Sequence, residues 1–243
     1  MIVGFRAIVE ALESGKEFDK VMLQKGLKGE LQNETRRILK EYNVPFQLVP
    51  PEKLDRLTKA NHQGIIGFTT PISFHDLGNL IQQTFETGTT PKFIYLDQVS
   101  DVRNFGAICR SAECNGFHGV IVPEKGAAQI NEDAVKTSAG ALFHIPVART
   151  KSIDETIELL QQSGIQLVSC TEKTETLLFE VDMTKPTCII MGSEDVGISN
   201  EFLRRSEILA KIPMDGRTSS LNVSVAAGII MYELNRQRIC LEK

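Results

Sequence analysis

From residue 92 onward, short and largely apolar runs alternate with longer segments of helical periodicity. The apolar runs predict strands at 93–96, 120–122, 143–147, 165–169, 187–191 and 208–212. The segments between and after them predict helices at 104–114, 132–138, 153–163 and 222–238. Strands without polar alternation are buried on both faces, which is typical of a parallel sheet between two layers of helices. The sequence therefore predicts an α/β fold with a mostly parallel sheet over residues 91–243.

The first 70 residues predict a separate and smaller α/β domain. Strands are expected at 18–24, 46–49 and 64–70, with helices at 5–13 and 30–42. Pro50 and Pro51 end the second of these strands, because proline cannot donate to a sheet ladder. Residues 71–90 are interpreted as a linker, with one helix of apolar period before a turn that contains Gly88.

Composition narrows the class of protein. The 243 residues include 42% hydrophobic residues and carry a net charge of −4, as in an ordinary soluble protein. Residues 1–70 hold 11 Lys and Arg against 9 Asp and Glu, a net +2, whereas the remainder holds 16 against 22, a net −6. A mildly basic front half suits an RNA-guiding module, but ordinary scatter of surface charge explains so small a difference equally well.

Cysteine and histidine spacing argues against disulfides and metals. The five cysteines include no C-x-x-C pair, and the four histidines are scattered. We interpret the cysteines as reduced thiols and expect no metal site. The N-terminus lacks a basic segment followed by an apolar one, and no apolar run approaches about 18 residues. These features predict a cytoplasmic protein that does not bind membranes.

Three short stretches combine small residues with a lone polar side chain inside an apolar run. They lie at 104–110, 192–197 and 220–228. An unpaired buried polar group costs roughly 1–3 kcal/mol, so a core would favour Leu or Val at these places. Each stretch follows a predicted strand, directly or after a short gap, and the carboxyl ends of parallel strands meet at one edge of a sheet. We therefore expect one site assembled from three distant parts of the chain.

The polar residues of these stretches also have purely structural interpretations. Asn104, Ser220 and Asn222 all stand where a helix N-cap belongs. Arg110 either reaches solvent or pairs with an acid one turn on, or it grips a phosphate with its planar five-donor fork. Glu194 is a helix cap, an arginine partner or a ligand contact. The residues by themselves leave these alternatives open.

Two common nucleotide-binding signatures are missing from the chain. No G-x-G-x-x-G follows the first strand of a βαβ unit, and no G-x-x-x-x-G-K-[ST] occurs anywhere. A standard Rossmann dinucleotide site and a P-loop are therefore disfavoured.

The three stretches together resemble the SpoU (TrmH) family of RNA ribose 2′-O-methyltransferases, within the SPOUT superfamily. That family has N-x-G-x-x-x-R, then G-x-E-G-x-G, then I-P-M before S-L-N-V-S-V-A. The matching residues here are Asn104, Gly106, Arg110, Gly192, Glu194, Gly197, Ile212, Pro213, Met214 and 220–226. The front domain, with its sequence His62-Gln63-Gly64-Ile65, resembles the RNA-binding domain of the RlmB type, which methylates a guanosine in 23S ribosomal RNA. The similarity covers nearly the whole chain.

This resemblance implies a fold, a cofactor and a partner. It implies a deep trefoil knot in the C-terminal sheet and a homodimer with the site near the subunit interface. S-adenosylmethionine would be held around Gly192, Ile212, Met214 and Leu221. The implied substrate is RNA, with ribosomal RNA favoured over transfer RNA because of the front domain, and DNA is not expected. A non-catalytic RNA-binding protein of ribosome assembly is the alternative from another class.

The resemblance also assigns the reacting residues. Asn104 and Arg110 would hold the target nucleotide, and Glu194, Ser220 and Asn222 would complete the polar wall. The family's proposed base is the arginine, but a pKa above 12 makes that role physically awkward. A substrate phosphate or a relay through Ser220 is the alternative acceptor of the proton.

Two positions depart from the family pattern. Asp195 stands where the family usually has glycine, and Val102 lies where it often has proline. Because aspartate tolerates a left-handed backbone better than most residues, we expect the loop to survive the first change.

Overall fold

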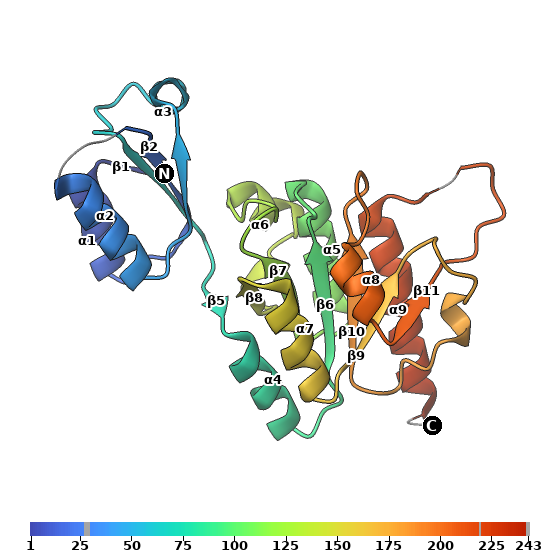
Figure 1. The fold of residues 1–243 in the computed structure, drawn as a ribbon. Helices are drawn as coiled ribbons and strands as arrows, with labels where there is room; N and C mark the ends of the chain where they lie inside the picture. The colour runs from blue at the N-terminus through green and yellow to red at the C-terminus, as the bar shows by residue number, and fades with distance from the viewer. Residues whose placement is uncertain (27–29, 219, 242–243) are drawn as a thin grey trace. The chain divides into compact units, whose positions relative to one another are not determined.

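The computed structural model describes residues 1–26, 30–218 and 220–241. It divides into two compact units, Met1–Ser73 and Phe74–Lys243. Figure 1 shows the course of the chain through both. Each unit has its own sheet and core, so they are described separately.

The first unit contains a four-stranded mixed sheet with helices. Its strands are β1 (Ile2–Val3), β2 (Phe18–Gln24), β3 (Phe46–Val49) and β4 (Ile65–Thr69), in the order β1-β4-β2-β3. Its helices are α1 (Phe5–Glu13), α2 (Glu30–Glu41) and α3 (Pro51–Leu57). β4 is antiparallel to β1 and β2, whereas β2 and β3 are parallel. Position 67 requires glycine for packing, because a Cβ built there would lie 2.4 Å from the ring of Phe18.

The second unit contains a seven-stranded sheet in which every pair of neighbours is parallel. Its strands are β5 (Phe74–His75), β6 (Lys92–Asp97), β7 (Gly119–Pro123), β8 (Val147–Thr150), β9 (Gln166–Cys170), β10 (Thr187–Gly192) and β11 (Ile208–Ala210). The order across the sheet is β11-β9-β10-β6-β7-β8-β5. Chain order and sheet order thus differ most around β9, β10 and β11.

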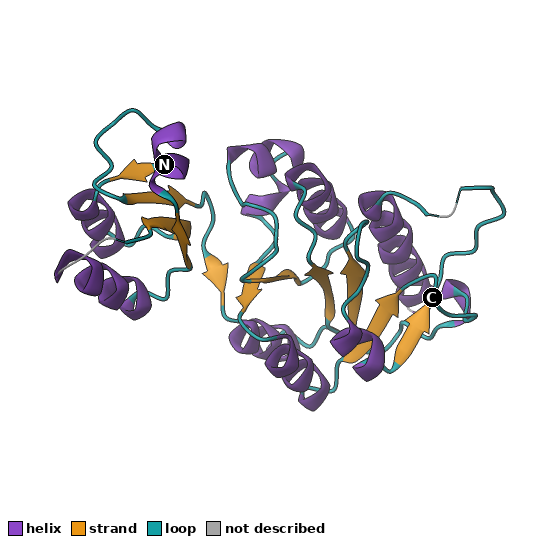
Figure 2. Ribbon diagram, turned by 45° about the horizontal axis from the view of Figure 1, so that its top comes forward, coloured by secondary structure: helices purple, strands orange, loops and turns teal. Residues whose placement is uncertain are grey.

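Two layers of helices cover this sheet. The helices are α4 (Leu77–Glu86), α5 (Val102–Cys114), α6 (Glu132–Thr137), α7 (Ile153–Gln162), α8 (Asn200–Arg205) and α9 (Val223–Leu241), with 3-10 turns η1 (Ala141–Phe143) and η2 (Leu178–Glu180). Phe93 and Tyr95 of β6 face α4, α7 and α8 in one core cluster. The alternate residues Ile94 and Leu96 are equally buried and point to the other face. Figure 2 shows the sheet between these two layers.

Three differences from the sequence prediction concern the sheet and core of the second unit. The strand predicted at 143–147 is wrong, because η1 occupies Ala141–Phe143 and β8 begins only at Val147. Pro146 cannot donate to a ladder, so the chain joins the sheet only after it. The strand predicted at 208–212 ends at Ala210. The helix placed in the linker, α4, is part of the second unit's core through Leu77, Leu80 and Ile81.

At the amino-terminal edge of the sheet, Arg238 near the end of α9 binds four backbone carbonyls. Its guanidinium donates to Thr90 O (2.6 Å), Pro91 O (2.9 Å), Met183 O (3.1 Å) and Lys185 O (2.7 Å). Burial lowers the pKa of Arg238 to about 10, which leaves the group charged at neutral pH. The final helix is thereby tied to the segments that lead into β6 and β10.

Lys92 and His118 complete this edge. Lys92 Nζ donates to Asn115 O (2.7 Å) and Asn235 Oδ1 (2.9 Å), which joins the ends of α5 and α9 to β6. The Lys92 backbone N–H donates to His118 Nδ1 at 3.1 Å. Burial first, and then the charges of Lys92 and Arg238, lower the pKa of His118 to about 4.

None of the helices in the described ranges is both long enough and apolar enough to cross a membrane.

Candidate active site

The three sequence stretches meet at the carboxylate of Glu194, in the loop that follows β10. Its Oε1 accepts hydrogen bonds from Asn222 Nδ2 (2.7 Å), Asn104 Nδ2 (3.3 Å) and the backbone N–H of Val223 (3.1 Å). Asn222 Nδ2 also donates to Asn104 Oδ1 at 3.0 Å. One carboxylate therefore joins α5, the loop after β10 and the first residue of α9. We call Asn104, Glu194 and Asn222 the polar hub.

Asn222 serves both as a helix cap and as part of the hub. Its Oδ1 accepts from the backbone N–H (3.0 Å) and the hydroxyl (2.5 Å) of Ser224, as an N-cap of α9 does. Its amide nitrogen is left to bind Glu194. The carboxylate of Glu194 also lies at the amino-terminal end of the long helix α9, where the helix dipole attracts negative charge. The two interpretations of Asn222 are thus compatible.

The capping interpretation of Asn104 is wrong. The N-cap of α5 is Asp101, whose carboxylate accepts from the N–H groups of Arg103 (2.8 Å) and Asn104 (2.9 Å). The helix begins at Val102, two residues earlier than predicted, so the side chain of Asn104 is free to reach Glu194. Val102 is the first helical residue, where proline is common but not required.

Gly106 sets the position of α5. A Cβ built there would lie 2.0 Å from Thr137 Oγ1 and 3.0 Å from Ala134 O, so only glycine lets α5 approach α6 this closely. Arg110, one turn on, is exposed and has no hydrogen-bond or ion-pair partner among the described residues. The predicted pairing with an acid one turn on, Glu113, is therefore not formed. Its guanidinium is available to a ligand.

Beside the hub lies a pocket of about 460 Å³. The loops that follow β9, β10 and β11 form its walls, together with the start of α9. Six of the nine residues that were assigned a catalytic or cofactor-binding role from the sequence line it, namely Gly192, Glu194, Ile212, Met214, Ser220 and Leu221. Asn104, Arg110 and Asn222 lie outside the lining. The pocket thus gathers the residues assigned to a cofactor, and the hub stands at its side.

Sequence reasoning missed one wall of this pocket. Cys170, Thr171, Glu172 and Lys173, at and after the end of β9, line it. The signal was present, because polar residues follow an apolar strand there as they do after β10 and β11. Burial raises the pKa of the Cys170 thiol to about 12, so it stays protonated and is unsuited to act as a nucleophile.

The loop after β10 needs both of its glycines, for different reasons. A Cβ built on Gly192 would lie 2.2 Å from the backbone carbon of Gly197, because the loop folds back on itself. Gly197 N–H donates to Ser193 O at 2.9 Å, and Gly197 has a φ of 77°. The left-handed residue is therefore Gly197 and not Asp195, which explains why aspartate is accepted at that place.

A second carboxylate, at the end of the neighbouring strand β6, fixes the far end of this loop. It was not predicted from the sequence. Asp97, the last residue of β6, is fully buried, and its Oδ2 accepts from the backbone N–H of Ser199 at 2.7 Å. Asp97 pairs with Gly192 in the register of β6 and β10. Its position at the end of an apolar strand was the only signal in the sequence.

All five cysteines are free thiols. Among the residues that the structure describes, no group of three His, Cys, Asp or Glu side chains is arranged to hold a metal ion.

Comparison with known protein families identifies both units. The model described as "SpoU rRNA Methylase family" matches residues 91–232, and the model described as "RNA 2'-O ribose methyltransferase substrate binding" matches residues 1–75. The putative TrmH family tRNA/rRNA methyltransferase YacO of Bacillus subtilis is 32% identical over 238 residues, which is 98% of this chain and 95% of that protein. Homologous proteins of Staphylococcus species are 33% identical over the same length.

Solved structures agree with this assignment. The SpoU methyltransferase AviRb of Streptomyces viridochromogenes is 28% identical, with a TM-score of 0.63 over 98% of this chain and 89% of that one. The same protein in complex with the cofactor AdoMet gives a TM-score of 0.62 at 27% identity, over 98% of this chain and 90% of that one. The predicted fold class is confirmed as an α/β SPOUT-type fold with a small mixed-sheet domain. Its trefoil knot stays a prediction. Because residues 91–232, more than half of the chain, match its model, the chain belongs to the SpoU rRNA methylase family of RNA methyltransferases.

Proposed function

We propose that this protein transfers a methyl group from S-adenosylmethionine to the 2′-hydroxyl of a ribose in RNA, with a guanosine of 23S ribosomal RNA as the target. The observation that carries the proposal is the polar hub standing beside the pocket. Asn104, Glu194 and Asn222 come from three separate parts of the chain and bind one another directly. Arg110, which is exposed and has no partner among the described residues, lies on the helix that supplies Asn104.

The pocket suits the methyl donor by size and lining. Its volume of about 460 Å³ lies within the range typical of small-molecule sites. Met191, Ile198 and Ile230 offer apolar contacts, and Gly192 lets a ligand approach the backbone. We assign the holding of the cofactor to Gly192, Ile212, Met214 and Leu221, which all line the pocket. S-adenosylmethionine supplies a methyl group on a sulfonium, already activated for transfer.

The protein's own residues then align the ribose and manage its proton. We assign Arg110 to a substrate phosphate near the 2′-oxygen, because the planar fork of a guanidinium matches the geometry of a phosphate. Asn104 and Glu194 orient the nucleotide, and Asn222 holds Glu194 in place. The proton of the 2′-hydroxyl goes to a substrate phosphate or to a relay through Ser220, which lines the pocket. Ser220→Ala separates the two routes, since only the relay loses its rate.

The front unit favours ribosomal over transfer RNA. Residues 1–75 match a substrate-binding model of RNA 2′-O ribose methyltransferases, which also supports the ribose as the acceptor. A TrmH/SpoU tRNA-modifying enzyme of A. aeolicus, 28% identical with a TM-score of 0.58, covers 67% of this chain and 86% of its own. The proteins that match 98% of this chain, by contrast, match the front unit as well. This match over the front unit is what favours ribosomal RNA as the substrate.

We also propose a homodimer formed through α9. Val225, Ile229, Tyr232 and Ile239 are 40–64% exposed and follow one another at helical spacing. An exposed apolar row of this kind on a well-packed helix is typical of a protein interface. A second copy of the chain is the occupant that the family resemblance implies. Sedimentation of the wild type and of Tyr232→Glu tests it, with a monomeric wild type as the contrary result.

Transfer of labelled methyl from S-adenosylmethionine to unmodified large-subunit ribosomal RNA tests the catalytic proposal. The product is mapped by its resistance to alkaline cleavage, which a 2′-O-methyl group confers. We expect one new block at a guanosine in a loop, because an unpaired nucleotide exposes its ribose most easily. If only transfer RNA is labelled, the proposed substrate is wrong and the proposed reaction stands. Label in neither RNA would contradict the proposed function.

A further inference from the structure

Arg103 and Arg110 form a row on one exposed face of α5. They are seven residues apart, which on a helix is two turns, or about 10.5 Å, with nearly the same direction. Gly106 lies between them and packs against Thr137 of α6. Both arginines are exposed. Because Gly106 lies between them on α5, the row runs beside the contact between α5 and α6. Arg103 is also the chain neighbour of the hub residue Asn104.

The arginines of the second unit divide into two groups. Five of them have partners: Arg149 stacks on Phe74, Arg204 pairs with Glu201, Arg205 with Asp154 and Glu158, Arg236 with Glu233, and Arg238 binds carbonyls. Among the described residues, Arg103, Arg110 and Arg217 have no such partner. Two of these three lie on the helix that carries Asn104.

The acid nearest to Arg103 along the chain, Asp101, caps the start of α5. Its Oδ1 accepts from the backbone N–H groups of Arg103 and Asn104, and it forms no ion pair with the Arg103 guanidinium among the described residues. Arg103 therefore keeps its five donors for a ligand. A phosphate is the ligand that its planar fork and its unneutralised charge favour, and Arg110 on the same face shares this chemistry.

We propose that Arg103 binds a second phosphate of the RNA strand whose first phosphate Arg110 holds. This proposal rests on the proposed function and extends it, since it assigns the direction of the substrate strand along α5. Arg103 is a positioning residue in this scheme. A phosphate contact sets the register of the strand and carries no base specificity. The strand then runs parallel to the row, past the hub.

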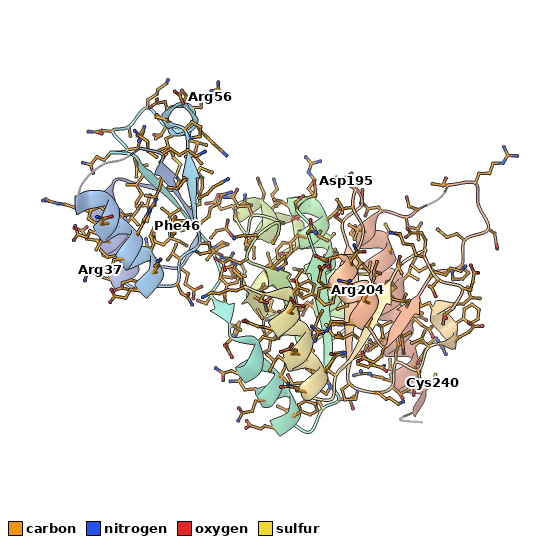
Figure 3. The ribbon with its side chains drawn as sticks, in the orientation of Figure 1. Arg37, Phe46, Arg56, Asp195, Arg204 and Cys240 are labelled. Atoms are coloured by element: carbon orange, nitrogen blue, oxygen red, sulfur yellow. The ribbon has the colours of Figure 1, made fainter. Side chains whose placement is uncertain are left out.

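The test compares Arg103→Ala and Arg103→Lys with a matched control, Arg204→Ala. Arg204 is an exposed arginine of the same unit, on α8, in the helical layer opposite to α5 (Figure 3). Binding of an unmodified large-subunit ribosomal RNA transcript is measured over a series of salt concentrations, without methyl transfer. The KM for RNA, the kcat and the affinity for S-adenosylmethionine are measured in parallel.

We expect Arg103→Ala to weaken RNA binding roughly fivefold and to lower the slope of log affinity against log salt by about 0.7. The KM for RNA rises while kcat and cofactor affinity stay unchanged, because the contact is equal in ground and transition states. Arg103→Lys keeps the salt slope, and Arg204→Ala leaves every value at that of the wild type.

An unchanged salt slope in Arg103→Ala, or an equal change in Arg204→Ala, overturns the proposal and leaves the proposed function standing. A wild type that binds RNA with the expected slopes but transfers no methyl group contradicts the proposed function alone, while the Arg103 contact is supported. A wild type that binds none of the RNA overturns both.

Discussion

The two edges of the seven-stranded sheet both hold arginines, and they use them in opposite ways. At the amino-terminal edge, Arg238 donates to four backbone carbonyls and ties α9 to the starts of β6 and β10. Helix α5 begins beyond the carboxyl end of β6, and its Arg103 and Arg110 have no partner among the described residues. Asp195 and Cys240 mark the two edges in Figure 3.

This difference distinguishes arginines that stabilise the fold from arginines that are available to bind a ligand. A guanidinium that satisfies several carbonyls contributes to stability, because its removal leaves those carbonyls without partners. An exposed arginine without a partner adds little to stability and can be used for binding. Substitutions at the two edges should therefore affect different properties, stability at one edge and catalysis or binding at the other.

The largest effect is expected for Arg110→Ala. Methyl transfer should fall at least about 100-fold, because the variant lacks the group that we assign to the substrate phosphate. Cofactor affinity should stay unchanged, since Arg110 does not line the pocket. Single-turnover transfer and calorimetry measure the two properties. If Arg110→Lys transfers methyl groups at nearly the full rate, a bidentate contact between Arg110 and phosphate is excluded. The contrast between the two groups of arginines would then be weaker.

The next effect is expected for Gly192→Ala. The added methyl group would lie 2.2 Å from the backbone of Gly197, so the loop that walls the pocket must move. Overpacking of this kind costs about 1–3 kcal/mol, which corresponds to a loss of cofactor affinity of roughly 10- to 100-fold. Gly216→Ala is the control, because a Cβ there meets nothing closer than 4.0 Å. Equal cofactor affinities in both variants would show that this loop does not shape the site.

At the opposite edge, Arg238→Met should reduce stability. Four carbonyls lose their donor, and we expect the free energy of unfolding to fall by about 2–3 kcal/mol. Urea unfolding measures it. Arg236→Met, which removes an ion pair between exposed Arg236 and the mostly buried Glu233, should cost about 1 kcal/mol or less, because Gln237 still donates to Glu233. If Arg238→Met keeps its stability but loses methyl transfer, the division between the edges is wrong.

The smallest effect is a pH dependence at His118. Its pKa is lowered to about 4 from an ordinary 6.5, so between these values the unfolded chain takes up a proton that the folded chain does not. The stabilisation is fully present above pH 6.5 and is lost as the pH falls towards 4. Because the ring is only half-buried, we expect about 1 kcal/mol over this window.

Urea unfolding at pH 7 and pH 5 measures the His118 effect. The pH dependence should shrink in His118→Gln and persist in His144→Gln, since His144 is exposed. A wild type whose stability does not change across the window would mean that the ring is protonated in the folded state.

Much of the fold follows from local patterns, and its exceptions have identifiable causes. The apolar runs at β6, β7, β9 and β10 predict strands correctly, because continuous burial leaves a clear signal. The run at 143–147 looks similar but contains Pro146, and the chain joins the sheet only beyond it. The helix α4 was placed in a linker because its apolar period does not show which core receives it.

For the candidate site, the sequence determined which residues are polar where an apolar core would exclude them, and the order in which they occur. That information is local, so it is sufficient to single out Asn104, Glu194 and Asn222 and to predict one site. Only the tertiary structure decided that a single carboxylate joins all three, and that Asp101, not Asn104, caps α5. It also decided which arginines are occupied and which are free. The physical reason is that hydrogen-bond partners separated by 28 to 118 residues are brought together only by the packing of α5, α9 and the loop after β10.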